Sequence, residues 1–135
     1  MKRFSFRLEK ALDWRRKQLE LEESRYKRQA AALADLDRAR AELEASAIRA
    51  EVQVRAWTPL AGRDLVALAQ FREYLSHAEQ TLAARRAACE RQLHEQEKVM
   101  LEARRRCRLL ERLRERRWEQ WRADCDRELE QFAAE

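Results

Sequence analysis

Cys89, Cys107 and Cys125 carry the side chains best suited to covalent or metal chemistry, and each lies 18 residues from the next. Eighteen residues are about five helical turns, so in one helix the three thiols share a face but lie roughly 27 Å apart. Thiols at that separation can neither form disulfides with one another nor bind one metal ion. We interpret them as small apolar residues of a helix seam, with redox sensing or an intermolecular disulfide as the alternative.

The histidines and carboxylates form no catalytic pattern either. His77 and His94 are 17 residues apart, too far for joint metal binding on one helix, and the sequence has no phosphate-binding loop and no Cys-x-x-Cys pair. The many carboxylates would lie on exposed helices, which offer no desolvated cleft for acid or base catalysis. We therefore expect no enzyme activity, no catalytic residue, no cofactor, no metal site and no small-molecule substrate.

Long helices must position all of these residues. The 135 residues include one glycine and one proline, both within residues 59–62, and these two residue types are the strongest helix breakers. Charged residues make up 41% of the chain and hydrophobic residues 45%, a composition typical of coiled coils. We predict an all-α fold, a long antiparallel two-helix coiled-coil hairpin with the second helix overhanging the first. Its parts are a first helix over 1–57, a turn over 58–63 and a second helix over 64–133.

A seam of residues spaced by three and four, the coiled-coil signature, runs through both predicted helices. In the first helix its apolar members include Leu12, Leu19, Tyr26, Leu33, Leu36 and Leu43, and its polar members are Arg15, Glu22 and Gln29. In the second helix the seam runs through Phe71, Leu75, Ala78, Leu82, Cys89, Leu93, Gln96, Met100, Ala103, Cys107 and Leu110. Polar seam residues lower stability but fix the register or bind a partner. We expect Asp64 to be the N-cap of the second helix.

The second helix should extend about 17 residues, or roughly 25 Å, beyond its partner. This overhang carries an apolar stripe of Trp118, Trp121, Cys125, Leu129 and Phe132, and we expect nothing in the chain to cover it. With the turn near residue 61, Phe4 should lie opposite Arg117 and Trp118. Exposed apolar stripes mark interaction sites, and tryptophan is enriched at binding hot spots. The overhang is therefore a predicted partner-binding surface.

Positive charge gathers at the same predicted end. Residues 102–122 carry nine arginines against four glutamates, and residues 1–20 carry seven basic against three acidic groups. A basic end attracts acidic partners. Nucleic-acid binding through the arginines of 104–117 is an alternative that we disfavour, because acidic residues are interleaved at Glu111, Glu115 and Glu119. No run of residues is long and apolar enough for a membrane span, and no secretory signal is expected, so we predict a cytoplasmic chain.

The opening segment Phe4–Leu12 reads Phe-Ser-Phe-Arg-Leu-Glu-Lys-Ala-Leu and is followed by Arg15 and Glu20. It resembles the N-terminal signature of the FliJ family of flagellar export proteins. The resemblance extends over the whole chain through its length, its mid-chain Gly/Pro break, a following Phe-x-x-x-Leu helix and an arginine-rich second arm. The equivalent rod of virulence-type secretion systems and a basic coiled-coil scaffold that binds nucleic acid are the alternatives.

The resemblance implies a non-enzymatic, stalk-like component of the flagellar type III export apparatus, similar to the gamma subunit of rotary ATP synthases. Partners would be the hexameric export ATPase, the cytoplasmic domain of the export gate and export chaperones, and the membrane would be met only through the inner-membrane export apparatus. The family's gate-binding face would fall on Phe71, Leu75 and Ala78, although the next position of that face, which can be histidine in the family, is Leu82 here. We place the predicted ATPase-binding residues at the open end of the hairpin: Phe4, Phe6, Arg114, Arg117, Trp118, Trp121 and Leu129.

Overall fold

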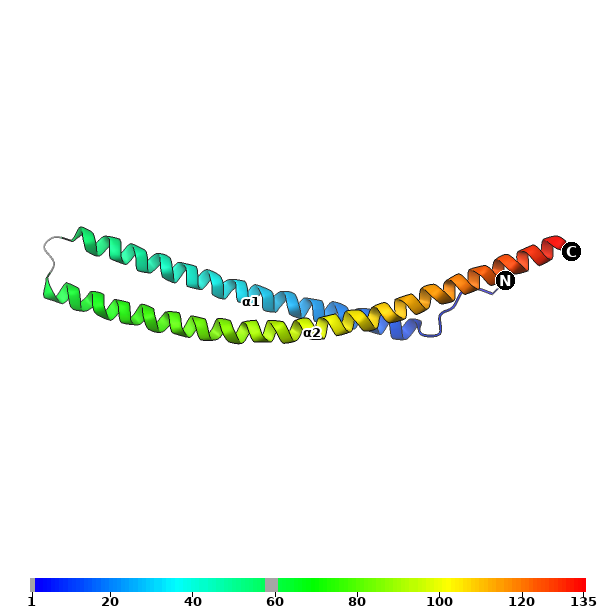
Figure 1. The fold of residues 1–135 in the computed structure, drawn as a ribbon, viewed down its shortest axis with the longest axis horizontal. Helices are drawn as coiled ribbons and strands as arrows, with labels where there is room; N and C mark the ends of the chain where they lie inside the picture. Colours follow the sequence, from blue (N-terminus) through cyan, green and yellow to red (C-terminus); the bar gives the residue numbers. More distant parts are fainter. Residues whose placement is uncertain (1, 58–60) are drawn as a thin grey trace. The chain divides into compact units, whose positions relative to one another are not determined.

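Two long helices make up the chain in its computed structural model, which describes residues 2–57 and 61–135. Helix α1 spans Glu9–Ala56 and helix α2 spans Gly62–Ala134, and no strand occurs in the described ranges. Stretches of α1 and α2 pack side by side in opposite directions (Figure 1). The predicted all-α, antiparallel two-helix hairpin is confirmed.

Each helix contributes to two compact units. The open-end unit contains the residues up to Tyr26 and from Gln96 onward, and the turn-end unit contains Lys27–Glu95. All cross-helix contacts described below lie within one unit or the other.

The seam of the open-end unit contains the buried residues of the structure. Leu12 is fully buried, Cys107 is 2% exposed, and Met100 and Ala103 are also buried. Glu22, one of the polar seam residues predicted from the heptad pattern, is only 3% exposed. Its carboxylate accepts hydrogen bonds from Arg25 and from the side-chain amide of Gln96 across the seam. The predicted seam is confirmed here, including its polar member Glu22.

The predicted seam of the turn-end unit contains fewer polar residues than that of the open-end unit, but its residues are more exposed to solvent. Its predicted seam residues on α2, such as Phe71, Leu82 and Cys89, are half-buried, and none of the described residues of this unit is fully buried. Cross-helix ion pairs flank the seam, with Arg86 Nε 2.7 Å from Asp37 Oδ1 and Arg72 pairing with Glu51 at 3.6 Å. The hydrogen bond and charge of Asp37 raise the pKa of the Arg86 guanidinium.

The first helix begins at Glu9, which corrects the predicted start at residue 1. The Glu9 N–H donates to the Phe6 carbonyl at 3.1 Å, and residues 2–8 before it are not helical. Three of these residues, Lys2, Arg3 and Arg7, are basic and would oppose the positive end of a helix dipole, whereas Glu9 in the first turn favours it. The helix therefore starts at its first acidic residue.

The second helix begins at Gly62, two residues before the predicted start. The Asp64 and Leu65 N–H groups donate to the Ala61 carbonyl, and the Asp64 carboxylate accepts the Ala61 N–H at 3.0 Å. Asp64 therefore lies inside the first turn and bonds back to the residue before the helix, as the acidic partner of a capping box does. The prediction of Asp64 as the N-cap itself is wrong. Residues 58–60 of the predicted turn lie outside the described residues.

Candidate protein-binding surfaces

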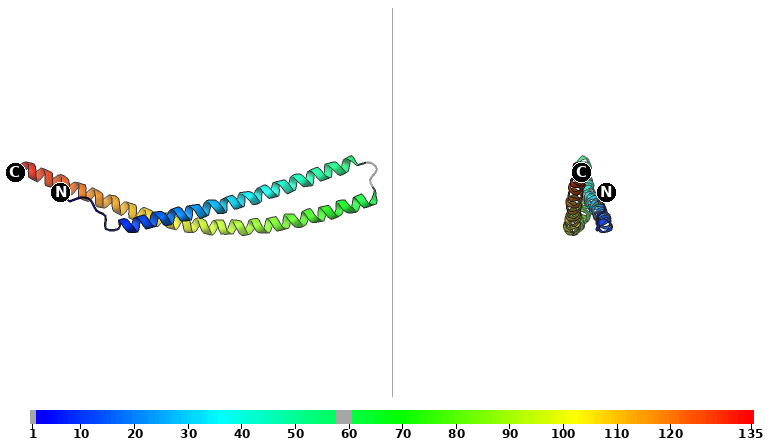
Figure 2. Two further views of the ribbon diagram at one scale, coloured as in Figure 1. Left: turned by 180° about the vertical axis from the view of Figure 1, so that it is seen from behind. Right: turned by 90° about the vertical axis from the view of Figure 1, so that its right-hand side faces the viewer.

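Residues 2–8, which we call the N-terminal strap, lie against the part of α2 that extends past the start of α1 (Figures 1 and 2). The indole Nε1–H of Trp121 donates a hydrogen bond to the Lys2 carbonyl at 3.0 Å. The ring of Phe4 packs on Trp121 with 5.9 Å between centroids and an interplanar angle of 55°. Such tilted aromatic pairs are favourable beyond the area that they bury.

Arg114 joins the strap to both helices. Its Nε donates to Glu9 Oε2 at 2.9 Å, and its guanidinium lies over the Phe4 ring at 5.4 Å from the centroid. One cation therefore holds the first turn of α1 and the aromatic ring of the strap at once. Both partners of the ion pair are partly exposed, so its value lies in fixing the geometry more than in adding stability.

A shallow hollow of about 720 Å³ lies between the strap and α2. Aromatic rings of Phe4, Phe6 and Trp121 line it together with Leu8 and Leu113. Its charged lining residues are the cationic Lys2, Arg3, Arg7 and Arg117 and the acidic Asp124. A surface that combines apolar area with an excess of positive charge suits an acidic protein partner, because the apolar area gives affinity and the charge gives orientation.

The strap corrects the expectation that the apolar stripe of the overhang is uncovered. Trp121 is half-buried under Lys2 and Phe4, whereas Trp118 remains 39% exposed with the Arg122 guanidinium 5.4 Å from its ring centroid. Leu129 and Phe132 are 52% and 80% exposed. Of the predicted stripe, Trp121 is therefore covered by the strap, whereas Trp118 before it and Leu129 and Phe132 after it remain exposed.

The predicted ATPase-binding residues divide in the same way. Phe4, Phe6, Arg117 and Trp121 line the hollow, and Arg114 contacts Phe4 from beside it. Trp118 and Leu129 do not line the hollow and are exposed on α2. Phe4 was expected opposite Arg117 and Trp118. It contacts Arg114, about one turn before them, and Trp121, about one turn after them.

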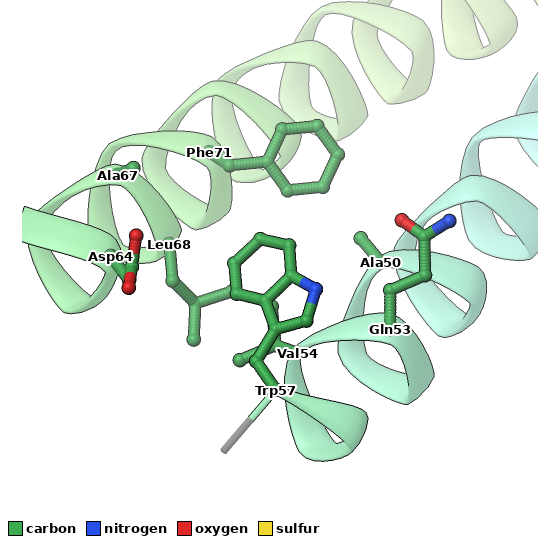
Figure 3. A pocket seen from close by; sticks show the side chains of 8 residues that line it. All are labelled: Ala50, Gln53, Val54, Trp57, Asp64, Ala67, Leu68 and Phe71. Atoms are coloured by element: carbon green, nitrogen blue, oxygen red, sulfur yellow. The ribbon is translucent and has the colours of Figure 1, made fainter. Parts of the chain in front are cut away.

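A second hollow, of about 300 Å³, lies in the turn-end unit beside the connection between the helices (Figure 3). Trp57 and Val54 line it from the end of α1, and Leu68 and Phe71 line it from α2. Figure 3 shows the Trp57 ring reaching across the gap toward Leu68, with the Phe71 ring above it. Half of the Trp57 surface, 47%, remains exposed.

The three predicted gate-binding residues share one face of α2, but only Phe71 reaches this hollow. Phe71 also stacks on Tyr74, with ring centroids 6.4 Å apart. Leu75 and Ala78 are half-buried seam positions. An apolar surface that a partner could reach therefore consists of Phe71 and its neighbours Trp57, Leu68 and Tyr74.

Two features of these surfaces were missed from the sequence. The strap could have been found from the two-residue spacing of Phe4 and Phe6, which alternate with exposed residues. Side chains two residues apart lie on the same side of an extended chain but not of a helix, so this spacing indicates an extended segment. The role of Trp57 has a weaker signal, its position just before residues 59–62, which contain the only proline and glycine of the sequence.

Comparison with known proteins gives no assignment: no family model, no curated protein and no solved structure matches the chain. Within the described ranges, neither helix has an apolar stretch that could cross a bilayer. The same residues contain no group of three or more histidine, cysteine or acidic side chains arranged to hold a metal ion.

Proposed function

We propose that this chain is a non-enzymatic, stalk-like component of the flagellar type III protein export apparatus. In this proposal it binds and activates the hexameric export ATPase through the open-end unit. It links the ATPase to the cytoplasmic domain of the export gate through the turn-end unit. It also interacts with export chaperones. It would work in the cytoplasm, associated with the inner membrane only through the export apparatus.

The observation that carries the proposal is the composite surface of the open-end unit. The strap and α2 together form a hollow lined by aromatic rings and an excess of cationic side chains, and α2 continues past it to Ala134 with exposed apolar residues. A stalk that enters a ring needs apolar area at its end for affinity and charge for orientation. The resemblance of Phe4–Leu12 to the FliJ signature falls on this surface, because Phe4 and Phe6 are two of its aromatic residues.

The proposed mechanism is allosteric and requires no chemistry from the chain itself. A protein that binds one state of a ring more tightly than another shifts the population toward that state by the difference in affinity. Contacts of the hollow and of the exposed Trp118 and Leu129 with the assembled ring would favour the assembled, active hexamer over free subunits.

The gate contact is proposed for the hollow beside the helix connection. Phe71, Trp57 and Leu68 give it an apolar lining, and Tyr74, 65% exposed, extends this surface outward. Leu75 and Ala78 would support Phe71 from within the seam. A small apolar hollow with aromatic edges is a suitable acceptor for one apolar side chain of a partner.

The deciding experiment measures turnover of the cognate export ATPase with and without the full chain. The variant Trp118→Ala/Leu129→Ala removes exposed apolar residues of α2 without touching the strap contacts. The matched control, Trp14→Ala/Leu21→Ala, removes a tryptophan and a leucine of similar exposure that lie outside the proposed surface.

We expect the native chain and the control to stimulate turnover and the Trp118→Ala/Leu129→Ala variant to stimulate it less. Equal stimulation by all three would retain the activator function and reject the binding surface. Absence of stimulation by the native chain, with an ATPase that is itself active, would reject the proposal. Stimulation only of a virulence-type ATPase would move the chain to that secretion system.

A further inference from the structure

One face of α2 in the open-end unit carries exposed leucines among arginines. This basic outer face consists of Leu101, Arg104, Arg105, Arg108, Leu109 and Arg112, which together line a shallow hollow of about 280 Å³. Their spacing of three, four, seven, eight and eleven residues places them along one side of a helix. Met100, Ala103 and Cys107 of the same stretch are buried in the seam, so most of the outer face points away from α1. Arg104, at the edge of the face, is half-buried and reaches Glu23 of α1.

The carboxylates of this region neutralise only part of the outer face. Glu111 interacts with Arg16 of α1 at 3.5 Å and with the Cys107 thiol, which places it toward the seam. Glu102 pairs with Arg105 and Arg106. Glu115 is exposed one turn after Arg112, and in the described part of the chain it forms no ion pair with the face. The interleaved acidic residues therefore do not neutralise the outer face as a whole.

Two guanidinium groups of the face are left for a partner. Arg104 pairs with Glu23 of α1 at 3.7 Å and Arg105 with Glu102 at 3.6 Å. In the part of the chain that the structure describes, Arg108 and Arg112 form no ion pair and are exposed. They lie one turn apart, on either side of Leu109.

We propose that the basic outer face of α2 binds an acidic amphipathic helix of a partner protein. Leu101 and Leu109, 47% and 53% exposed, would receive the apolar stripe of that helix, and Arg108 and Arg112 would pair with carboxylates flanking the stripe. Recognition of an amphipathic helix by an apolar surface with complementary charge at its edges is a common mode of peptide binding. The partner helix would pack on α2, on the side away from α1.

Charge and apolar area together favour a protein helix over nucleic acid. A phosphate backbone would use the arginines but would leave both leucines without a partner, whereas an acidic amphipathic helix uses both kinds of side chain. The proposal is independent of the ATPase contact, because the outer face shares no residue with the hollow beneath the strap.

The test uses the full chain and three fluorescent probes in anisotropy titrations. The first is a synthetic helical peptide with leucines at alternating three- and four-residue spacing flanked by glutamates. The second has the same composition with its leucines dispersed around the helix, and the third is an oligodeoxythymidylate. Only the first probe matches the outer face in both charge and apolar pattern.

Two variants locate the binding site. Arg108→Gln/Arg112→Gln removes the unpaired charges, and its control, Arg85→Gln/Arg91→Gln, makes the same charge change at exposed positions of α2 in the turn-end unit. Leu101→Gln/Leu109→Gln removes the apolar pair, and its control is Leu65→Gln/Val66→Gln, at positions of similar exposure. Circular dichroism checks that all four variants remain helical.

We expect the patterned peptide to bind more tightly than the dispersed one, and each variant of the face to weaken its affinity by roughly three- to tenfold while the controls do not. Equal binding of the two peptides, tighter binding of the oligonucleotide, or no binding of the patterned peptide would each overturn the proposal. Equal losses in the variants and their controls would also overturn it, since binding would then follow net charge alone.

Discussion

The Trp121 indole donates its N–H to the Lys2 carbonyl at 3.0 Å, which joins residues 119 positions apart in the sequence. This bond shows how the open-end unit differs from a simple pair of helices. A non-helical strap satisfies the polar group of a tryptophan and covers its ring with Phe4. The surface offered to a partner is therefore built from three chain segments, the strap, the first turn of α1 and α2.

The contact of Phe4 with Trp121 predicts a measurable change in solvent access. In a chain with Trp14, Trp57 and Trp118 replaced by Phe, Trp121 is the only tryptophan. Phe4→Ala removes an aromatic pair worth about 0.5–1.5 kcal/mol, so the strap should detach more often. We expect stronger quenching of Trp121 fluorescence by acrylamide and an emission shift to longer wavelength.

Phe132→Ala in the same single-tryptophan chain is the matched control, because Phe132 is 80% exposed on the same helix. It should leave quenching of Trp121 unchanged. If Phe4→Ala and Phe132→Ala behave alike, the strap does not cover Trp121 in solution.

The seam pair Glu22 and Gln96 predicts a second, larger effect. The Glu22 carboxylate, 3% exposed, accepts from Gln96 and from Arg25, and the Gln96 amide also lies 3.3 Å from the Glu22 carbonyl oxygen. Gln96→Leu removes both cross-helix bonds and leaves a buried carboxylate with one partner. The free energy of unfolding should fall by about 1–3 kcal/mol, measured by urea denaturation and circular dichroism.

The double variant Glu22→Leu/Gln96→Leu should recover most of that loss, because two apolar seam residues replace a polar pair without leaving either member unpaired. Gln80→Leu, at an exposed position of α2, controls for the change of residue type. A double variant less stable than Gln96→Leu would contradict this view of the seam.

How much of this fold could be predicted depends on whether a feature is local in sequence. The seam of residues such as Leu12, Met100 and Cys107 was predictable, because helical periodicity alone places them on one face. The same seven-residue spacing also placed the polar residue Glu22 in the seam. Each of these follows from spacing within a single helix.

The strap and the hollows were not predictable in the same way. Whether Phe4 and Phe6 continue a helix or lie along another one depends on contacts with Trp121 and Arg114, more than 100 residues away. Charge alone predicted a basic open end but could not tell that Glu111 faces the seam while Arg108 and Arg112 face outward. That division depends on the register between the two helices.

The start of α2 gives a third prediction. Asp64→Ala removes the carboxylate that accepts the Ala61 N–H and takes a negative charge from the first turn. The loss should be about 0.5–2 kcal/mol and local, seen as faster amide exchange over 62–66. Asp64→Asn keeps an acceptor oxygen and should lose less, and Glu79→Ala, an exposed acidic residue within α2, should leave exchange there unchanged. Equal exchange rates in Asp64→Ala and the native chain would show that the hydrogen bond from the Ala61 N–H to the Asp64 carboxylate does not stabilise the start of α2.

The buried thiol of Cys107 gives a fourth prediction, in pH. Burial raises the pKa of Cys107, and the nearby Glu111 carboxylate raises it further. Folding therefore favours the neutral thiol, and this contribution to stability is complete below the unfolded-state pKa of about 8.5 and is lost as pH rises through the folded pKa. The free energy of unfolding of the native chain should fall more steeply with alkaline pH than that of Cys107→Ala.

The comparison between the two chains isolates this thiol, because lysine and tyrosine titrations are common to both. Cys107→Ala also opens a cavity in the seam, which lowers stability at every pH and shifts the whole curve without changing its slope. Parallel curves for the native chain and Cys107→Ala would mean that the thiol ionises as readily in the folded protein as in the unfolded chain. The burial of Cys107, which is 2% exposed, would then not change the pKa of its thiol.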